Sequence, residues 1–500
     1  MIMIPVCFEE QFLPGTLEYA IHTLIEHEVD MSVFDAKYNN DETGCRAFNP
    51  KILLKAVLLG YARRLLSSRE IEKACKNVIS FMAITCGQAP DHSTIAAFVS
   101  SMENEIKLIF RDILLYCDKK GLLGGTCFSI DGCKLPANAS KEMSGTFEQL
   151  EKKKGRLEKQ LEKLFEEHQH NDLTAFEEHQ HNDLPTFEEQ QHNDLPAKAR
   201  KLEKKVNTMN NFLKYNEPKS GQKHKENKSN VTDNDSQLML TSHGVIQGYN
   251  AQAFVDSKHQ IIVFSDAGSS GQDDEHGSIM IEGAKENLKA IGKDEDCLKN
   301  VDVLCDSNYY SPTNFQKLID LEINGYIPDK DFRKRDPRYT HSDPKFSLTD
   351  FDYQPERDVY ICPAGAELTR QRDTKRKGKK YYRHYAADEK ACLHCQNRHR
   401  CLAKKTSKRR WLSVYYDKKL ARYARDMIER IDSDEGRKKY DQRFGMVEPV
   451  FANIRYQKRM DRFGLRGKKK VDIQWRLYCL VHNIEKCIPF CGNVAFSPAI

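Results

Sequence analysis

Apolar residues in the first 120 positions recur at helical spacing and are separated by short polar turns. Asn49–Tyr61 opens with a proline at its first turn and then repeats leucine, isoleucine and valine every three or four residues. Ser67 and Glu70 have the spacing of a capping box, and Asp91 marks a further helix start. The pattern predicts a helix-turn-helix-like DNA-binding domain over residues 1–120, although an ordinary helical bundle has the same pattern.

Beyond residue 120 the pattern changes to short apolar runs that alternate with helical segments. A strand at 325–328 follows a predicted helix at 312–323, and another helix is expected at 277–291. These runs predict an α/β core, α+β overall, with a mixed sheet flanked by helices. The other predicted strands are 126–131, 301–305 and a hairpin formed by 245–255 and 260–264 around the turn 256–259.

A polar insertion, 147–230, interrupts this core. It contains an eleven-residue repeat in three copies, and leucines at heptad-like spacing lie on both sides of the repeat. We predict an antiparallel helical hairpin whose tip has been lengthened by duplication, because Pro185 and Pro196 disfavour one continuous helix. The copies are Phe165–Ala175, Phe176–Thr186 and Phe187–Ala197.

A second insertion, 329–430, is basic and rich in cysteine. Four of its cysteines have the ligand count of a structural Zn²⁺ site, although packing residues are the alternative. The segment looks too poor in apolar residues to form its own core, so a zinc-pinned knuckle that presents Lys and Arg to DNA is the predicted form. The cysteines are Cys362, Cys392, Cys395 and Cys401.

Charge is informative locally rather than globally. Charged residues make up 30% of the chain, yet the net charge is only +6. Residues 436–470 hold twelve Lys or Arg against three acids, and 369–383 hold eight against one. Basic charge interleaved with aromatic residues predicts a surface that follows a phosphate backbone, with a merely solvated basic face as the alternative.

The chain has no stretch of about 20 apolar residues of the kind that spans a membrane, and acids stand near its start where a signal peptide would be basic. We therefore expect a cytoplasmic protein without a membrane partner. In that compartment the sixteen cysteines should be mostly reduced.

Three carboxylates that are far apart in the sequence are the candidate catalytic groups. Asp131 and Asp306 each end a predicted strand, and Glu448 lies on a predicted helix. Such a set can hold two Mg²⁺ ions about 3.5–4 Å apart, which clamps the attacking and leaving oxygens of a phosphodiester. Any one of these aspartates taken alone is more often a turn former or a helix cap.

Four motifs in order make the chain resemble the DDE transposases of bacterial insertion sequences. They are Asp131–Ser140, Gly248–Gln252 followed by Val255-Asp256, Cys305–Ser311 and Arg437–Asn483. The resemblance implies a ribonuclease-H-like catalytic core in three pieces, which are 121–146, 231–328 and 431–490.

The resemblance also implies roles for individual residues. Asp131, Asp306 and Glu448 would be the catalytic residues that hold two Mg²⁺ ions. Pro449 suggests that the last helix starts near Glu448, and two helical turns would place Arg455 on the same face. The residues expected to bind DNA are Tyr440, Arg443, Arg455, Lys458 and Arg459.

The implied function is cleavage and strand transfer at the ends of an insertion sequence. The partners would be the terminal inverted repeats, target DNA and further copies of the chain, which would form a homo-oligomer on DNA. Two alternatives stay open at this point: a catalytically inactive remnant that still binds DNA, and a plain nuclease of the same fold.

Overall fold

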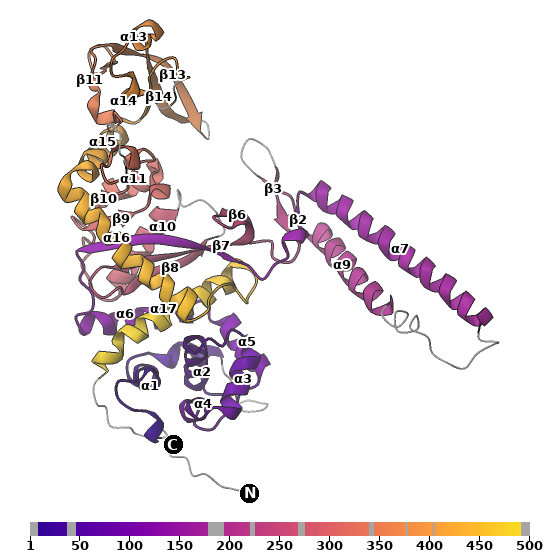
Figure 1. Cartoon of the computed structure of the whole chain (residues 1–500). Helices are drawn as coiled ribbons and strands as arrows, with labels where there is room; N and C mark the ends of the chain where they lie inside the picture. The colour runs from indigo at the N-terminus through magenta and orange to yellow at the C-terminus, as the bar shows by residue number, and fades with distance from the viewer. Residues whose placement is uncertain are drawn as a thin grey trace.

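The chain folds into a helical region, a central mixed sheet, a projecting helical arm and a small β-rich unit (Figure 1). The computed structural model describes residues 9–37, 47–178, 195–220, 226–268, 276–339, 345–376, 379–402, 404 and 406–491. Among the described helices, none combines the length and the apolar character needed to cross a lipid bilayer.

The N-terminal region is helical, as predicted. Ser67 and Glu70 form the expected capping box at the start of α3, and Asp91 accepts hydrogen bonds from the first backbone amides of α5. Near the C-terminus, α17 (Lys468–Cys487) packs against α2, α5 and α6 and also against strand β8, so one buried helix joins this region to the sheet. The N-terminal helices are α1 (Leu17–His27), α2 (Pro50–Ala62), α3 (Ser68–Asn77), α4 (Ile79–Ile84), α5 (His92–Ser101) and α6 (Glu105–Lys119).

The central sheet has six strands in the order β10-β9-β1-β7-β6, with β8 also paired to β7. Strands β1, β9 and β10 are mutually parallel, and β6, β7 and β8 are antiparallel to their neighbours, so the predicted mixed sheet is confirmed. The sequence did not predict β6. The strands are β1 (Cys127–Pro136), β6 (Gln237–Thr241), β7 (Gly244–Asp256), β8 (Ile262–Gly268), β9 (Asp302–Cys305) and β10 (Asn324–Tyr326); helices α10 (His276–Ala290) and α11 (Pro312–Asp320) connect them.

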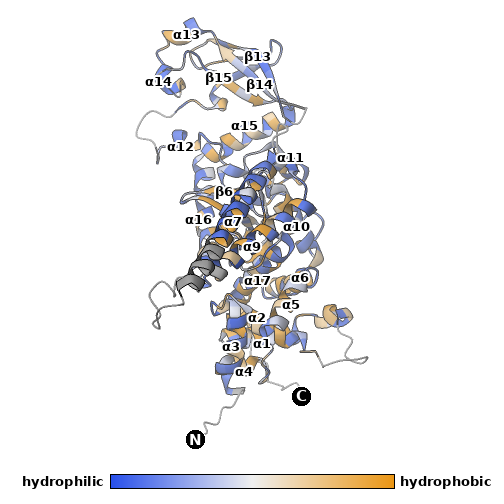
Figure 2. Ribbon diagram, turned by 90° about the vertical axis from the view of Figure 1, so that its right-hand side faces the viewer, coloured by the Kyte–Doolittle hydropathy of each residue, from blue (hydrophilic) through white to orange (hydrophobic). Residues whose placement is uncertain are grey.

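The first insertion forms the arm. Helices α7 (Phe147–Glu178) and α9 (Leu195–Tyr215) lie side by side and project away from the sheet (Figures 1 and 2). Helix α7 includes the first copy of the repeat, and Pro196 falls in the first turn of α9, where proline is tolerated. Pro185 lies outside the described residues. Short pairs, β2 (Ser144–Gly145) with β5 (Ser229–Asn230) and β3 (Lys219–Ser220) with β4 (Glu226–Asn227), form the base of the arm.

The second insertion has a core of its own, so the expectation that it lacks one is wrong. Tyr360, Tyr385 and Leu412, at alternating positions of its antiparallel strands, are buried together with Phe351. Tyrosine rings supply much of this apolar surface, which a count of aliphatic residues misses. The elements are β11 (Asp352–Gln354), β12 (Val359–Ile361), β13 (Glu367–Arg376), β14 (Lys379–Ala387), β15 (Trp411–Tyr415), α13 (Glu389–Leu393) and α14 (Arg398–Cys401).

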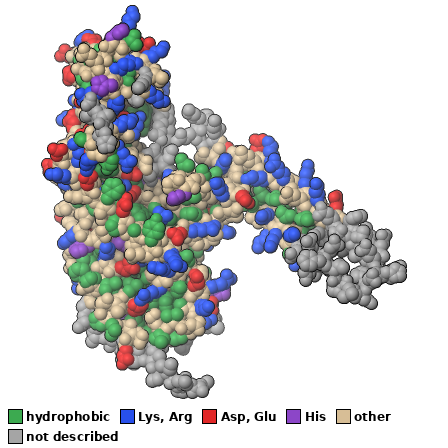
Figure 3. Space-filling model, viewed as in Figure 1, with side chains coloured by type: hydrophobic (Ala, Val, Ile, Leu, Met, Phe, Trp, Pro, Cys, Tyr) green, Lys and Arg blue, Asp and Glu red, His purple; other side chains and the backbone are tan. Residues whose placement is uncertain are grey.

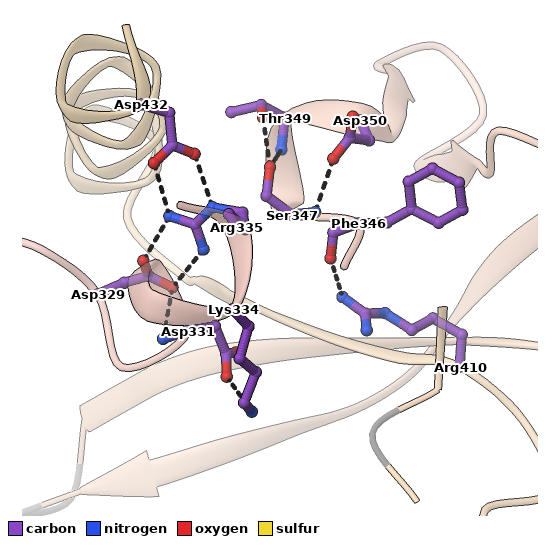
Figure 4. Close-up of polar contacts among 10 residues, drawn as sticks. All are labelled: Asp329, Asp331, Lys334, Arg335, Phe346, Ser347, Thr349, Asp350, Arg410 and Asp432. Carbon is purple, nitrogen blue, oxygen red and sulfur yellow. Dashed lines mark hydrogen bonds and ion pairs between the residues drawn. The ribbon is translucent and has the colours of Figure 1, made fainter. Parts of the chain in front are cut away.

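An ion-pair cluster fixes the junction between this unit and the core (Figure 4). Arg335, the last residue of α12 (Phe332–Arg335), is buried; its Nε lies 2.6 Å from a carboxylate oxygen of Asp432, at the end of α15 (Lys418–Asp432). Its terminal nitrogens donate to Asp329, the shorter contact being 2.7 Å. A buried cation needs such compensation, so α12 and α15 are held together at this point.

Candidate active site

Two of the predicted catalytic carboxylates lie side by side, where β9 ends beside the middle of β1. Strands β1 and β9 are parallel, with Ile130 opposite Cys305. Asp131 follows Ile130, and Asp306 follows Cys305. Neighbouring strands lie about 4.8 Å apart, so the two aspartates start from adjacent backbone positions. The sequence correctly predicted that β9 ends before Asp306, but the prediction that Asp131 ends its strand is wrong, because β1 continues to Pro136 in its pairing with β7. The register of β1 against β9 brings the two aspartates together.

Each aspartate is oriented by its surroundings. Asp131 accepts a hydrogen bond from the Gly132 amide at 2.8 Å and forms an ion pair with Arg443, whose terminal nitrogen lies 3.1 Å away. Asp306 caps the short turn η5 (Ser307–Tyr309) by accepting from the Asn308 amide at 2.8 Å. These contacts restrict the rotamers of both carboxylates.

Glu448 lies in α16 (Asp434–Ala452), and its position in that helix differs from the prediction. The helix is capped by Ser433 and runs through both Glu448 and Pro449, whereas the sequence suggested a start near Glu448. Pro449 has no N–H to give to the carbonyl of Gly445, and the side-chain amide of Gln260 donates to that carbonyl at 2.8 Å instead. This replacement bond explains why the helix tolerates the proline.

Glu448 faces the same cavity as Asp306. The cavity measures about 480 Å³ and is also lined by Tyr440 and Arg443. Lys330 and Arg333, which sequence reasoning missed, add positive charge to its wall. Basic residues shortly after the predicted strand 325–328 could have indicated them. That strand is β10, which runs parallel to β9, so the residues after both strands lie at the same end of the sheet.

Arg443 is the central charge of the site. Burial lowers its pKa, but the neighbouring carboxylates of Asp131 and Asp306 outweigh burial and raise that pKa above its usual value. Tyr440 packs edge-on against Phe332, and burial raises its pKa to about 12, so its hydroxyl stays protonated at neutral pH. Both residues were predicted to bind DNA; the structure places them beside the carboxylates.

The remaining basic residues of the prediction lie after α16, in and beyond the π-helical turn η7 (Asn453–Gln457). Because η7 is not α-helical, the two-turn count that placed Arg455 on the face of Glu448 does not apply. Arg455 is half-buried and close enough to Cys133 of β1 to affect its pKa, which burial chiefly raises. Arg459 is exposed and remains available to DNA.

Lys458 must be removed from the predicted DNA surface. Its side chain is 1% exposed, and its ammonium group lies 2.6 Å from a carboxylate oxygen of Glu485 on α17. Burial lowers its pKa despite that partner. Lys458 therefore holds η7 against α17 and cannot reach a phosphate in this conformation.

The four cysteines of the second insertion line one cavity of about 580 Å³. Cys362 accepts a hydrogen bond from the Ala366 amide, and all described cysteines are free thiols. Within the described parts of the chain, no three His, Cys, Asp or Glu side chains are gathered closely enough to hold a metal ion as they stand. The zinc site, like the magnesium site, therefore stays a prediction.

Comparison with known families finds two matches. A model described as a transposase DDE domain matches residues 361–488, and one described as a transposase domain (DUF772) matches residues 6–101. The first match includes Glu448 but neither Asp131 nor Asp306, and the second covers most of the N-terminal helices. No curated protein matches the chain.

Proposed function

We propose that this chain, which belongs to the DDE transposases and pairs a DDE domain with an N-terminal transposase domain, cuts DNA at the ends of an insertion sequence and joins those ends to target DNA. Its core would be ribonuclease-H-like, and Asp131, Asp306 and Glu448 would be its catalytic residues. Both steps are phosphodiester chemistry at one site.

The observation that carries this proposal is the strand register. It sets Asp131 and Asp306 side by side where β9 ends beside β1, and Glu448 lines a cavity there together with Asp306. The three residues are separated by more than a hundred positions in the chain. Neither the neighbouring positions of Asp131 and Asp306 nor the cavity shared by Asp306 and Glu448 is therefore a consequence of local sequence.

The donor set fits divalent magnesium, because it consists of carboxylate oxygens beside a cavity with room for water. Asp131, Asp306 and Glu448 would hold the ions. When bound, they would supply charge neutralisation and a more acidic attacking water. Arg443, which contacts Asp131, would have to give up part of that contact to the metal.

The protein's own residues then position the DNA. Lys330, Arg333 and Arg443 surround the carboxylates with positive charge, which attracts a backbone phosphate to the cavity. Arginine can bind that phosphate through two nitrogens, so it also orients the scissile bond for in-line attack. Gly132 and Asn308 hold the aspartates through their backbone amides.

Other parts of the chain would bind the DNA outside the catalytic site. The N-terminal helices would recognise the terminal inverted repeats, and Arg455, Arg459 and the basic face of α16 would follow the backbone. Figure 3 shows Lys and Arg side chains spread over the arm as well. Further copies of the chain would assemble on the two element ends, since both ends must be joined to one target.

The test compares cleavage with binding. We expect D131N, D306N and E448Q each to abolish magnesium-dependent cleavage of DNA that contains an element end, while binding of that DNA stays within a few-fold of the wild type. Asp320→Asn, at the exposed end of α11, is the matched control and should cleave normally. A second DNA duplex in the assay separates a transposase, which yields a joined product, from a plain nuclease, which does not. Cleavage by D306N would refute the assignment.

A further inference from the structure

A second cavity opens beside the carboxylate cavity and is walled by aromatic rings. It measures about 590 Å³, within the range of sites that enclose a small organic group. Ser307, Asp329 and Lys330 line both cavities, so the two are continuous. A DNA strand with a phosphate at the carboxylates would reach the second cavity with its next nucleotides.

One wall of this cavity is a face of the β13–β15 sheet. The register places Tyr382 opposite Tyr415 and His384 opposite Ser413, with Trp411 next along the same face. All five line the cavity. Tyr385, which lies on β14 between Tyr382 and the position opposite Trp411, does not line the cavity and belongs to the core of the unit. The sheet therefore contributes to the core of the unit and also supplies rings and hydrogen-bonding groups to the cavity.

The groups on the open face suit a nucleobase. Trp411 is 42% exposed, and Arg372 and Arg409 lie over its ring at 5.8 and 4.9 Å from the centroid. His384 contacts the hydroxyls of Ser413 at 2.9 Å and Thr374 at 3.1 Å. Burial and the charge of Arg372 lower the pKa of His384, so the ring is neutral at neutral pH.

The opposite wall is polar and rigid. The buried Arg335, held by Asp329 and Asp432, faces the cavity with Ser347 (Figure 4). The Arg410 side chain bonds the carbonyl of Phe346 across the junction. Edge hydrogen bonding from this wall and stacking from the sheet are the two interactions by which proteins hold an unpaired base.

We propose that the open face of β13–β15, centred on Tyr382, His384 and Trp411, binds unpaired bases of the DNA strand whose phosphate lies at the carboxylates. The proposal rests on the proposed function. Duplex DNA does not suit this face, because paired bases keep their rings stacked inside the helix, whereas a strand opened at the cut site presents them.

The chain provides its own reporter for the test. It has two tryptophans. Trp475 is fully buried and donates to the Gln252 carbonyl at 2.9 Å, so bound DNA cannot reach it. A base that stacks on Trp411 should therefore quench the only accessible indole emission.

The experiment titrates the full chain, without metal, with a forked duplex that ends in unpaired bases and with a blunt duplex of the same sequence. We expect the fork to quench tryptophan emission strongly and the blunt duplex to quench it weakly. With a labelled fork, W411A should weaken binding roughly five- to a hundredfold, the range for loss of one stacked base. W411F should keep most of the affinity and lose the quenching.

The control variant is Tyr215→Ala, which removes a ring that is 73% exposed at the end of α9 and should leave fork binding unchanged. Equal quenching by fork and blunt duplex, or equal affinity of W411A and wild type for the fork, would overturn the inference. Neither result would affect metal-dependent cleavage, and a chain that binds forks as expected but never cleaves would refute the proposed function alone.

Discussion

A buried hydrogen bond between Tyr309 and Gln252 is expected to hold Asp306 in place. Tyr309 ends η5, the turn that Asp306 caps, and its hydroxyl donates to the Gln252 side-chain oxygen at 2.5 Å. Both side chains are buried, at 1% and 0% exposure. Gln252 lies on β7, beside β1, so this bond ties the segment after β9 to the strand next to Asp131.

Replacing Tyr309 with phenylalanine removes the donor without changing the ring. Loss of one partner of a buried hydrogen bond costs about 1–3 kcal/mol, so we expect the free energy of unfolding in urea to fall by about 2 kcal/mol. η5 then loses one of its anchors, three residues from Asp306, while the Tyr309 carbonyl keeps its bond from Asn314. Cleavage should fall roughly ten- to a hundredfold, as for a displacement of about 1 Å at a catalytic group. DNA binding should not change.

The matched control is Tyr116→Phe. That hydroxyl donates to the Phe490 carbonyl at 2.9 Å in another part of the molecule, with no link to the carboxylates. Both variants should lose similar stability, and only Y309F should lose cleavage when both are assayed well below their unfolding temperatures. Equal loss of cleavage in the two variants would refute the reasoning, because it would trace the effect to stability alone.

Three further predictions concern stability and metal content. Deleting residues 176–197 removes two repeat copies with the adjoining ends of α7 and α9, so the retained first copy must supply the turn between the two helices. Thermal stability and cleavage should stay nearly unchanged, because the arm projects away from the sheet (Figure 1) and closure entropy changes by only about 0.6 kcal/mol per doubling of a loop; a large loss of either would show that the repeat contacts the core or DNA. Burial and the charge of Lys55 lower the pKa of His22 to about 4. Below about pH 6.5, His22 therefore binds a proton in the unfolded chain but not in the folded chain. The contribution of His22 to the free energy of unfolding should therefore be complete above that pH, and that free energy should fall by about 1 kcal/mol near pH 5, after allowance for partial exposure. In urea titrations, H22Q should reduce this dependence on pH. Elemental analysis should find one zinc per chain that C392S and C395S lose, and a zinc-free wild type that folds normally would leave the four thiols as packing residues.

Local signals predicted the elements that depend on neighbouring residues. The capping box at Ser67 and the turn between β7 and β8 are examples, because their hydrogen bonds lie within a few positions of the chain. The end of β9 directly before Asp306 was also predicted, since an acid after an apolar run is visible without knowing which strands pair. The same rule failed for Asp131, because β1 continues to Pro136 in its pairing with β7.

Local sequence signals gave wrong predictions where a residue far away in the chain supplies a hydrogen-bond or ion-pair partner. Nothing near Pro449 indicates that Gln260, on the loop before β8, donates to the freed carbonyl of Gly445. Nothing near Lys458 indicates that Glu485 neutralises it in the interior. In both cases a rule that holds for an isolated helix or an exposed lysine is overridden by tertiary packing.

The register of β1 against β9 is the feature on which the carboxylate site depends most. Asp131 and Asp306 lie outside residues 361–488, which the transposase DDE model matches, and the pairing of β1 with β9 brings the two aspartates together. A slip of one residue would turn Asp131 to the other face of the sheet. The buried Ser129 hydroxyl donates to the carbonyl of Leu304, the residue opposite it, at 2.9 Å, a bond between the two strands that supports the observed register. A buried polar group inside an apolar strand, two residues before Asp131, is therefore part of the means by which the sequence specifies its active site.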